Sequence, residues 1–375
     1  MLDTFRRDPR VRLVAACDPL AAAREQFARD FAGRTYETAE GLCADQAVEL
    51  IYIASPHQLH AEHVAMAAAN GKHVLLEKPM AITLEECTLA IDAMQAANRT
   101  LIVGPSHSFD APVLKARQII DSGAVGEVRM IHALNYTDFL YRPRRPEELK
   151  TEQGGGVIHS QAAHQMDIIR LLGGGRLRTV RAFTGQWDGK RPTEGAYSAL
   201  LRFESGAFAS ITYSGYGRFD SDEWMEGQSE LGLTKAVNDY GGARKRLAVF
   251  ASEDDESAAK AQRNYGGSSY KRGADPSSHQ HFGPIIVSCD RADLRLTPSG
   301  VWVCADETRE FFATSLPDVP RREVIDEAWA ALRESVPARH DGAWARATTE
   351  ACLAILSSAR EDSDSVLTWQ VPWQR

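Results

Sequence analysis

The first hundred residues alternate short apolar runs with segments whose apolar residues recur at helical spacing. Apolar runs that end at turn residues indicate buried strands, and they lie at residues 11–17, 49–54, 73–76 and 101–104. The segments between them indicate helices at residues 21–31, 59–69 and 83–97. Thr83, with Glu86 three residues later, predicts a capping box at the start of the last of these helices. This rhythm predicts right-handed crossovers and a parallel sheet, whose ligands bind outside the carboxyl ends of the strands.

From about residue 127 the pattern changes to longer strands with partial alternation. We expect these strands at residues 128–136, 179–187, 196–203 and 207–213, with a hairpin turn at Glu204-Ser205-Gly206. Helices are expected at residues 160–172, where Gly173-Gly174-Gly175 follows, and at residues 323–334 and 344–359. Strands joined by hairpins predict a second domain with a large, mostly antiparallel open sheet. The polar stretch at residues 216–280 is too long for a simple connection and indicates a mobile segment or a functional lid.

Composition narrows the class of protein. At 375 residues, with 43% hydrophobic and 25% charged residues, the chain suits a soluble enzyme of two domains. The formal net charge of −8 argues against a nucleic-acid partner, which requires a basic surface. No apolar run approaches the ~20 residues that span a bilayer, and the first residues lack the apolar core of a secretory signal, so no membrane association is expected. Six scattered cysteines without a CxxC pair favour reduced thiols and a cytoplasmic location.

Asp18 ends the first apolar run. In a dinucleotide-binding fold, an acid at this place accepts hydrogen bonds from the adenine ribose and repels a 2′-phosphate. The alternative is a turn residue, because Asp-Pro dipeptides are common in turns. The strand–helix context favours ribose binding, and hence NAD, with NADP as the alternative cofactor.

Glu77-Lys78-Pro79 directly follows the apolar run at residues 73–76. A lysine at the carboxyl end of such a strand lies where a nicotinamide ring would bind. Burial lowers the pKa of its ammonium group, which can then exchange a proton near neutral pH. Exposed lysines in turns are also common, so the tripeptide alone is a weak signal.

A third motif is the glycine-rich stretch before the helix at residues 160–172. Gly154-Gly155-Gly156 lets the backbone approach a ligand closely. Ser160 and His164 are four residues apart and therefore lie on one face of a helix. His164 can carry the proton of a hydroxyl group that loses a hydride. The alternative is a buried histidine that is hydrogen-bonded to the backbone.

Taken together, these motifs resemble the Gfo/Idh/MocA family of oxidoreductases, nearly from end to end. The segments that carry the resemblance are Ala54-Ser55-Pro56-His57 through His60, Glu77-Lys78-Pro79, the stretch that ends in His164, residues 109–128 and His340-Asp341-Gly342. The resemblance implies a Rossmann-type NAD(P)-binding domain, which we place at residues 1–114. It also implies an α+β substrate and oligomerisation domain with the C-terminal helices, at residues 115–375, whose open sheet forms a homodimer or homotetramer.

The same resemblance implies roles for individual residues. Lys78 takes the position of the family's catalytic acid/base, and His164 that of its catalytic histidine. Ser160 replaces the aspartate of the family's DxxxH pair and is expected to contact the substrate. The residues expected to bind the cofactor are Asp18, Ser55, Pro56, His57, His60, Glu77 and Lys78.

One branch of the family is especially similar. Residues 136–146, 191–197 and 278–283 resemble the phthalate dihydrodiol dehydrogenases. The branch implies oxidation of a cis-dihydrodiol of an aromatic carboxylate to a catechol. Arg142, Arg144 and Arg145 offer guanidinium groups that can pair with carboxylates, although a solvated loop is an equal alternative. His279 and His281 are further expected substrate contacts. The alternatives are a sugar or cyclitol dehydrogenase, and a non-catalytic dinucleotide-binding protein.

Two features limit this interpretation. His57, His60 and His63 are spaced like metal ligands, but no acidic ligands accompany them, so we expect no metal. No GxGxxG motif precedes the strand that ends at Asp18. The nucleotide-binding domain is therefore expected to lack its first strand and Gly-rich turn, because of a start codon placed too late. A chain that starts at Met1 is then expected to bind cofactor weakly and to leave an unpaired edge beside the central strands.

Overall fold

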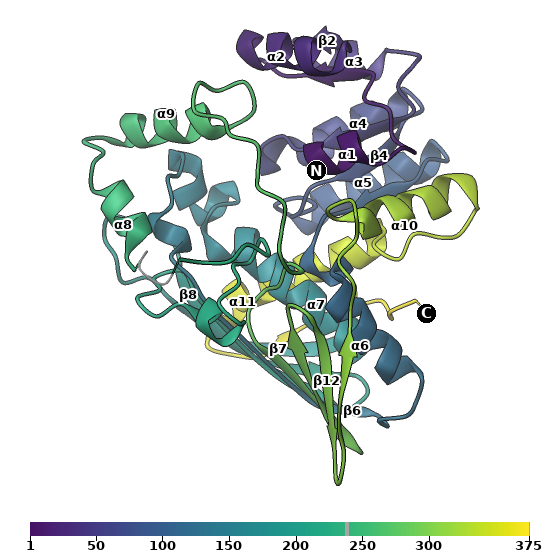
Figure 1. Cartoon of the computed structure of the whole chain (residues 1–375), viewed down its shortest axis with the longest axis vertical. Coiled ribbons are helices and arrows are strands. Elements are labelled where there is room, and N and C mark those ends of the chain that lie inside the picture. The colour runs from purple at the N-terminus through teal and green to yellow at the C-terminus, as the bar shows by residue number, and fades with distance from the viewer. Residues whose placement is uncertain (237–239, 375) are drawn as a thin grey trace.

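The computed structural model describes residues 1–236 and 240–374. Figure 1 shows the N-terminal elements in one lobe and a large sheet, covered by helices, in the other. In the N-terminal lobe, β3 (Leu50–Ile53), β4 (His73–Leu76) and β5 (Leu101–Val103) form a parallel sheet. The crossover helices are α4 (His60–Ala69) and α5 (Leu84–Ala96). The predicted capping box at Thr83 and Glu86 is present, which fixes the start of α5.

A second, smaller parallel sheet consists of β1 (Ala15–Cys17) and β2 (Arg34–Tyr36). The short helix α1 (Leu2–Arg7) precedes it, and α2 (Ala21–Phe31) and α3 (Ala39–Cys43) pack against it. Within the described residues, β1 and β3 are not hydrogen-bonded to each other. The parallel strands of this lobe therefore form two sheets instead of one.

The second lobe contains a nine-stranded sheet in the order β13-β12-β11-β10-β6-β9-β8-β7-β14. The four predicted strands are present as β6 (Val128–Tyr136), β7 (Leu177–Gly185), β8 (Ala196–Phe203) and β9 (Phe208–Ser214). The strands that the sequence did not predict are β10 (Ile285–Cys289), β11 (Ala292–Thr297), β12 (Gly300–Ala305), β13 (Arg309–Ala313) and β14 (Ser365–Val366). Of the described strand pairs in this nine-stranded sheet, only β6 and β9 run parallel. The sheet is therefore mostly antiparallel, as expected.

Three helices cover one face of this sheet: α6 (Ala111–Asp121), α7 (Ala163–Gly173) and α11 (Gly342–Glu361). Ile131, Leu201 and Ile211 of the sheet are fully buried beneath them. The helix α7 ends at Gly174, whose φ of 92° suits a glycine in the left-handed region, as the glycine run predicts. Before α7, a π-helical turn spans Ile158–Ala162. Ser160 and His164 therefore do not have the regular helical spacing that the sequence predicts.

The chain then returns to the N-terminal lobe. The helix α10 (Arg322–Arg333) packs its Val324 and Ile325 against Phe5, Leu75 and Ile102 in one apolar cluster. The last described helices thus join both lobes. None of the helices in the described part of the chain is long and apolar enough to cross a membrane.

The polar stretch at residues 216–280 contains α8 (Gly242–Leu247) and α9 (Glu253–Arg263), and its residues 237–239 lie outside the described part. Its helix α9 is held to the second lobe by the buried ion pair of Arg191 with Glu256. Beyond α9, the Tyr265 hydroxyl donates to Asp30 of α2 over 2.7 Å. The stretch therefore bridges the two lobes, which Figure 1 also shows. Whether it acts as a lid stays a prediction.

Candidate active site

The loops that follow β3 and β4 form the centre of the site. Because these strands are parallel, their carboxyl ends meet at one edge of the sheet, and the loops bring Ser55 and Lys78 into the same region. His60 joins the two loops. Its Nδ1 lies 2.8 Å from the carbonyl oxygen of Pro79, and its Nε2 lies 2.9 Å from that of Ser55. Since His60 is also fully buried, it supports the loops, and its contribution to cofactor binding stays a prediction.

His57 and Pro56 start the short helical turn after β3. Nδ1 of His57 lies 3.2 Å from the carbonyl oxygen of Gly154, in the glycine-rich stretch of the second lobe. Burial, followed by the nearby charge of Lys78, lowers the pKa of His57 to about 3. His63 hydrogen-bonds the hydroxyl of Ser55 at 3.0 Å. Each of the three closely spaced histidines therefore already has a partner within the protein.

Lys78 is directed towards the second lobe. Its Nζ donates a hydrogen bond of 2.7 Å to the backbone carbonyl of Ser160. Burial lowers the pKa of Lys78 to about 8, although the adjacent carboxylate of Glu77 opposes the shift. Glu77 itself accepts a hydrogen bond from the hydroxyl of Tyr52. Ser160 was expected to contact the substrate, and the structure shows its carbonyl orienting the amine of Lys78.

His164 lies close to Lys78 and has an uncharged imidazole. Burial and the positive charge of Lys78 hold the pKa of His164 well below its usual range. Its Nδ1 lies 3.4 Å from the hydroxyl oxygen of Ser106. Its ring contacts His107 and Phe282, with centroid distances of 4.7 and 5.3 Å. A neutral imidazole in this place can accept or pass on a proton.

An aromatic wall, which the sequence did not reveal, borders His164. Phe282 stacks on Tyr213 of β9 with ring centroids 5.9 Å apart, and Tyr213 stacks on Tyr197 of β8 at 5.8 Å. Tyr197 and Phe282 lie in the segments 191–197 and 278–283, but the contacts between the rings arise only in the fold, because the residues come from distant parts of the chain. All three rings are buried, so they belong to the packed core behind His164.

The two arginines expected to bind substrate both have internal partners. Arg142 pairs with Asp138 at 3.0 Å and with Glu230 at 3.7 Å. Arg144 lies over the ring of Phe139, 3.6 Å from its centroid, and donates to the backbone carbonyl of that residue. Its nearest carboxylate is Glu148, at 3.9 Å. Burial lowers the pKa of Arg144 to about 10, which still leaves it charged at neutral pH. Both arginines are thus engaged in internal contacts.

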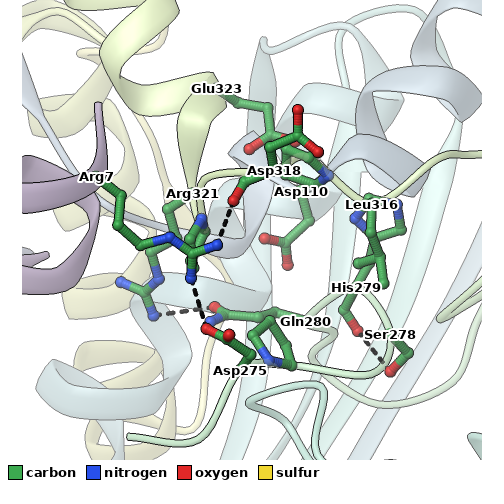
Figure 2. A pocket seen from close by; sticks show the side chains of 13 residues that line it. Arg7, Asp110, Asp275, Ser278, His279, Gln280, Leu316, Asp318, Arg321 and Glu323 are labelled. Atoms are coloured by element: carbon green, nitrogen blue, oxygen red, sulfur yellow. Dashed lines mark hydrogen bonds and ion pairs between the residues drawn. The ribbon is translucent and has the colours of Figure 1, made fainter. Parts of the chain in front are cut away.

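The two histidines at residues 279 and 281 lie in different surroundings. His281 is buried; its Nε2 lies 3.0 Å from the carbonyl oxygen of Gln228 and its Nδ1 accepts from the backbone of Gly283. His279 lines a cavity of about 300 Å³ with Gln280 and Arg321. Figure 2 shows this cavity, with residues from α1, from the segment at residues 275–280 and from the start of α10.

Comparisons with known proteins agree with this geometry. Residues 2–105 match the model described as the oxidoreductase family with an NAD-binding Rossmann fold, and residues 113–229 match the GFO/IDH/MocA C-terminal domain. A 1-carboxy-3-chloro-3,4-dihydroxycyclohexa-1,5-diene dehydrogenase of Comamonas testosteroni is 45% identical over 365 residues, which are 96% of this chain and 92% of the relative. The chain belongs to the Gfo/Idh/MocA family. It is an NAD(P)-dependent oxidoreductase.

Further similarities concern other dehydrogenases. The structure of a putative dehydrogenase from Bordetella bronchiseptica RB50 is 40% identical, with a TM-score of 0.91, and covers 98% of this chain and 96% of its own. An inositol 2-dehydrogenase of Salmonella typhimurium is 31% identical, but over only 46% of this chain and 50% of its own length. A levoglucosan dehydrogenase in complex with NADH shares the fold with a TM-score of 0.70 at 18% identity.

The residues present fit the cofactor of this family at two places. Lys78 follows β4 and Asp18 follows β1, at the carboxyl ends of parallel strands, where such folds bind dinucleotides. The contact of each residue with the cofactor stays a prediction. Asp18 also forms the turn that the alternative interpretation predicts, because its Oδ1 accepts from the backbone of Leu20 over 2.8 Å. Arg24 donates to the carbonyl of Asp18 over 2.7 Å, so a cation lies beside this acid. NAD and NADP therefore both remain compatible with this end of the site.

The motif at His340-Asp341-Gly342 has a structural role. His340 is buried, and its ring joins the Ser108 hydroxyl at 3.0 Å to the Glu327 carboxylate at 2.8 Å. The side chain of Asp341 caps α11 by accepting from the backbone of Trp344. The motif thus connects the loop after β5 with α10 and α11.

Proposed function

We propose that this oxidoreductase oxidises a cis-dihydrodiol of an aromatic carboxylate to the corresponding catechol, with NAD as the preferred cofactor. The observation that carries the proposal is Lys78, an amine with a lowered pKa whose direction is fixed by the carbonyl of Ser160 from the second lobe. The relative from Comamonas testosteroni, whose name specifies a carboxylated dihydroxycyclohexadiene, supports the substrate class.

In this proposal Lys78 is the base of the reaction. The carbonyl of Ser160 orients its amine, which takes the proton of the reacting hydroxyl group. The cofactor, when bound, supplies the acceptor for the hydride that leaves the same carbon. The resulting ketone tautomerises to a catechol, and the gain of aromaticity drives the step. His164, uncharged and adjacent, passes the proton onwards. Arg142, Arg144, His279 and His281 contribute to the surroundings of the substrate.

We further propose the larger organisation that the family resemblance implies. The cofactor-binding domain is placed at residues 1–114 and the substrate domain at residues 115–375, in a cytoplasmic homodimer or homotetramer. The outer face of the nine-stranded sheet supports assembly, because it exposes Phe183, Leu200 and Phe208 on neighbouring strands, at 62%, 58% and 48%. Apolar side chains grouped in this way are typical of a surface that pairs with another chain.

A panel of substrates tests the proposed function. Formation of reduced cofactor is followed with a dihydrodiol of benzoate or phthalate, and in parallel with myo-inositol and glucose, which represent the sugar and cyclitol alternative. We expect kcat/KM for the carboxylated dihydrodiol to exceed that for either polyol by about 100-fold or more, because oxidation of a polyol gains no aromaticity and a polyol lacks the carboxylate. Equal or faster oxidation of inositol would contradict the proposal, and no turnover of any alcohol would favour a non-catalytic protein.

A further inference from the structure

The ring of His164 is held by residues other than an aspartate. Ser160 stands at the position where the family resemblance implies an aspartate as the partner of this histidine. In the structure, Nδ1 of His164 lies 3.4 Å from the hydroxyl oxygen of Ser106. The rings of His164 and His107 meet edge to face, with centroids 4.7 Å apart and an interplanar angle of 68°. Both neighbours belong to the segment that follows β5.

The segment after β5 runs beside the loop that carries Lys78. Gly104 donates a backbone hydrogen bond of 2.8 Å to the carbonyl of Leu76, the last residue of β4. On the other side, Lys78 donates to the carbonyl of Ser160, which lies four residues before His164 in one helical segment. Hydrogen bonds on both sides therefore place the segment after β5 at the border of the reacting centre.

A carboxylate lies one step beyond His164, as the partner of His107. Nδ1 of His107 lies 2.7 Å from Oδ2 of Asp110, and the two side chains are only 8% and 12% exposed. Because an ionised carboxylate only accepts hydrogen bonds, this contact makes Nδ1 the donor. Nε2 of His107 is then the basic nitrogen of the neutral ring and can take up a proton.

Asp110 also lines the cavity of about 300 Å³ shown in Figure 2. Three further acidic side chains line it: Asp275, Asp318 and Glu323. The side chain of Asp275 is 74% exposed, so the cavity opens to solvent. Four carboxylates around one cavity raise the local concentration of cations, including protons, and repel anions. A series of direct contacts thus leads from His164 through His107 and Asp110 to water.

We propose that His107 and Asp110 carry the proton released in the reaction from His164 to the solvent of this cavity. This path rests on the proposed function and adds the route by which the proton leaves. Oxidation of the alcohol yields a ketone, reduced cofactor and one proton, which Lys78 takes from the hydroxyl group and passes to His164. His164 gives the proton to Nε2 of His107, directly or through one water, and Nδ1 of His107 gives its own proton to Asp110. Asp110 then protonates water, and His107 returns to its first tautomer.

Two properties of the site favour this path. Burial holds the pKa of His164 well below its usual range, so a proton that reaches this ring needs a further acceptor. A carboxylate beside an imidazole stabilises the positive charge that His107 carries during the transfer. His107 and Asp110 thus act through His164 and need no contact with the substrate.

Timing proton release against hydride transfer tests the path. One turnover of the full chain, with saturating NAD and a carboxylated dihydrodiol, is followed by stopped flow. The absorbance of NADH reports the hydride, and phenol red in weak buffer reports the proton. In the wild type we expect both signals to rise together. In Asp110→Asn, whose amide cannot take up the proton, release should be slower than hydride transfer by about tenfold or more. Added imidazole, a soluble proton acceptor, should remove this lag.

The matched control is Asp275→Asn, at an acid of the same cavity that pairs with Arg7 instead of His107. This variant should keep the two signals together. Asp110→Glu, which keeps the carboxylate, should shorten the lag of Asp110→Asn. His107→Gln removes the other member of the path and should give the same lag as Asp110→Asn. Thermal unfolding of each variant shows whether it is folded.

Different failures have different meanings. Simultaneous signals in Asp110→Asn and in His107→Gln overturn the proton path and leave the proposed function standing. A lag that imidazole does not shorten would give these residues a purely structural role and also overturn the path. A wild-type protein that does not oxidise the dihydrodiol contradicts the proposed function itself, and the same measurement with an alcohol that it does oxidise then tests the path.

Discussion

At the scale of single residues, the protonation of Lys78 controls when the site can act. A base must be neutral to accept the hydroxyl proton, and burial brings the pKa of this amine down to about 8. We therefore expect kcat/KM for alcohol oxidation to rise up to about tenfold per pH unit below pH 8 and to level off above it. A pH–rate profile of the wild-type enzyme measures this.

The variant His164→Asn is the control for that profile. Because the pKa of His164 is held well below its usual range, its own titration contributes nothing near pH 8. The variant should be slower but should keep the inflection. A wild-type profile that is flat across about pH 6–9 would contradict the role of Lys78.

Local motifs predicted some of these residues and missed others. The positions of Lys78 and His57 could be predicted because each lies in the loop after a parallel strand. The fold brings these loops to one edge of the sheet. The stacking of Phe282 on Tyr213 could not be predicted, since these rings meet only through the tertiary fold. The hydrogen bonds by which His60 joins two loops could not be predicted, because its burial between these loops is not visible in the sequence.

At the scale of elements, His60 joins the loops that follow β3 and β4. We predict that His60→Ala lowers the free energy of unfolding by about 2–4 kcal/mol, because two buried hydrogen bonds are lost and a cavity remains. It should also lower kcat, since Lys78 belongs to one of the loops. Denaturant unfolding and steady-state kinetics measure the two effects.

His63→Ala is the matched control on the same helix. His63 is only partly buried and hydrogen-bonds one side chain, the hydroxyl of Ser55, so its loss should cost less than about 1 kcal/mol. If both variants lost the same free energy of unfolding, the two loops would not depend on His60.

The same scale shows where the pattern of apolar residues stops being informative. Long strands with one buried face, such as β6 and β8, were predicted with their bounds because alternation or β-branched content is sustained. The strands β10 to β13 were missed. Each is only five or six residues long, so the pattern is too brief to stand out, although β11 does alternate buried and exposed residues. The stretch at residues 216–280 owes its arrangement to contacts between distant charges, which a sequence does not specify.

At the scale of the whole molecule, the open face of the nine-stranded sheet predicts assembly. We expect a dimer or tetramer in solution, and expect Leu200→Lys to shift it towards monomer, because a charge would be placed at the centre of the apolar group. Light scattering coupled to gel filtration measures the mass. Leu89→Lys, at an equally exposed leucine on α5, should leave the mass unchanged. A wild-type protein that is monomeric at all concentrations would contradict the assembly.

The variant Lys78→Ala tests most directly whether the amine between the two lobes performs the chemistry. Hydride transfer to NAD is followed with a carboxylated dihydrodiol, and NAD affinity is titrated separately, with Lys115→Ala as the control at an accessible lysine. The account predicts a loss of kcat of about 10²- to 10⁴-fold with NAD affinity largely kept. Unchanged turnover in Lys78→Ala would contradict it.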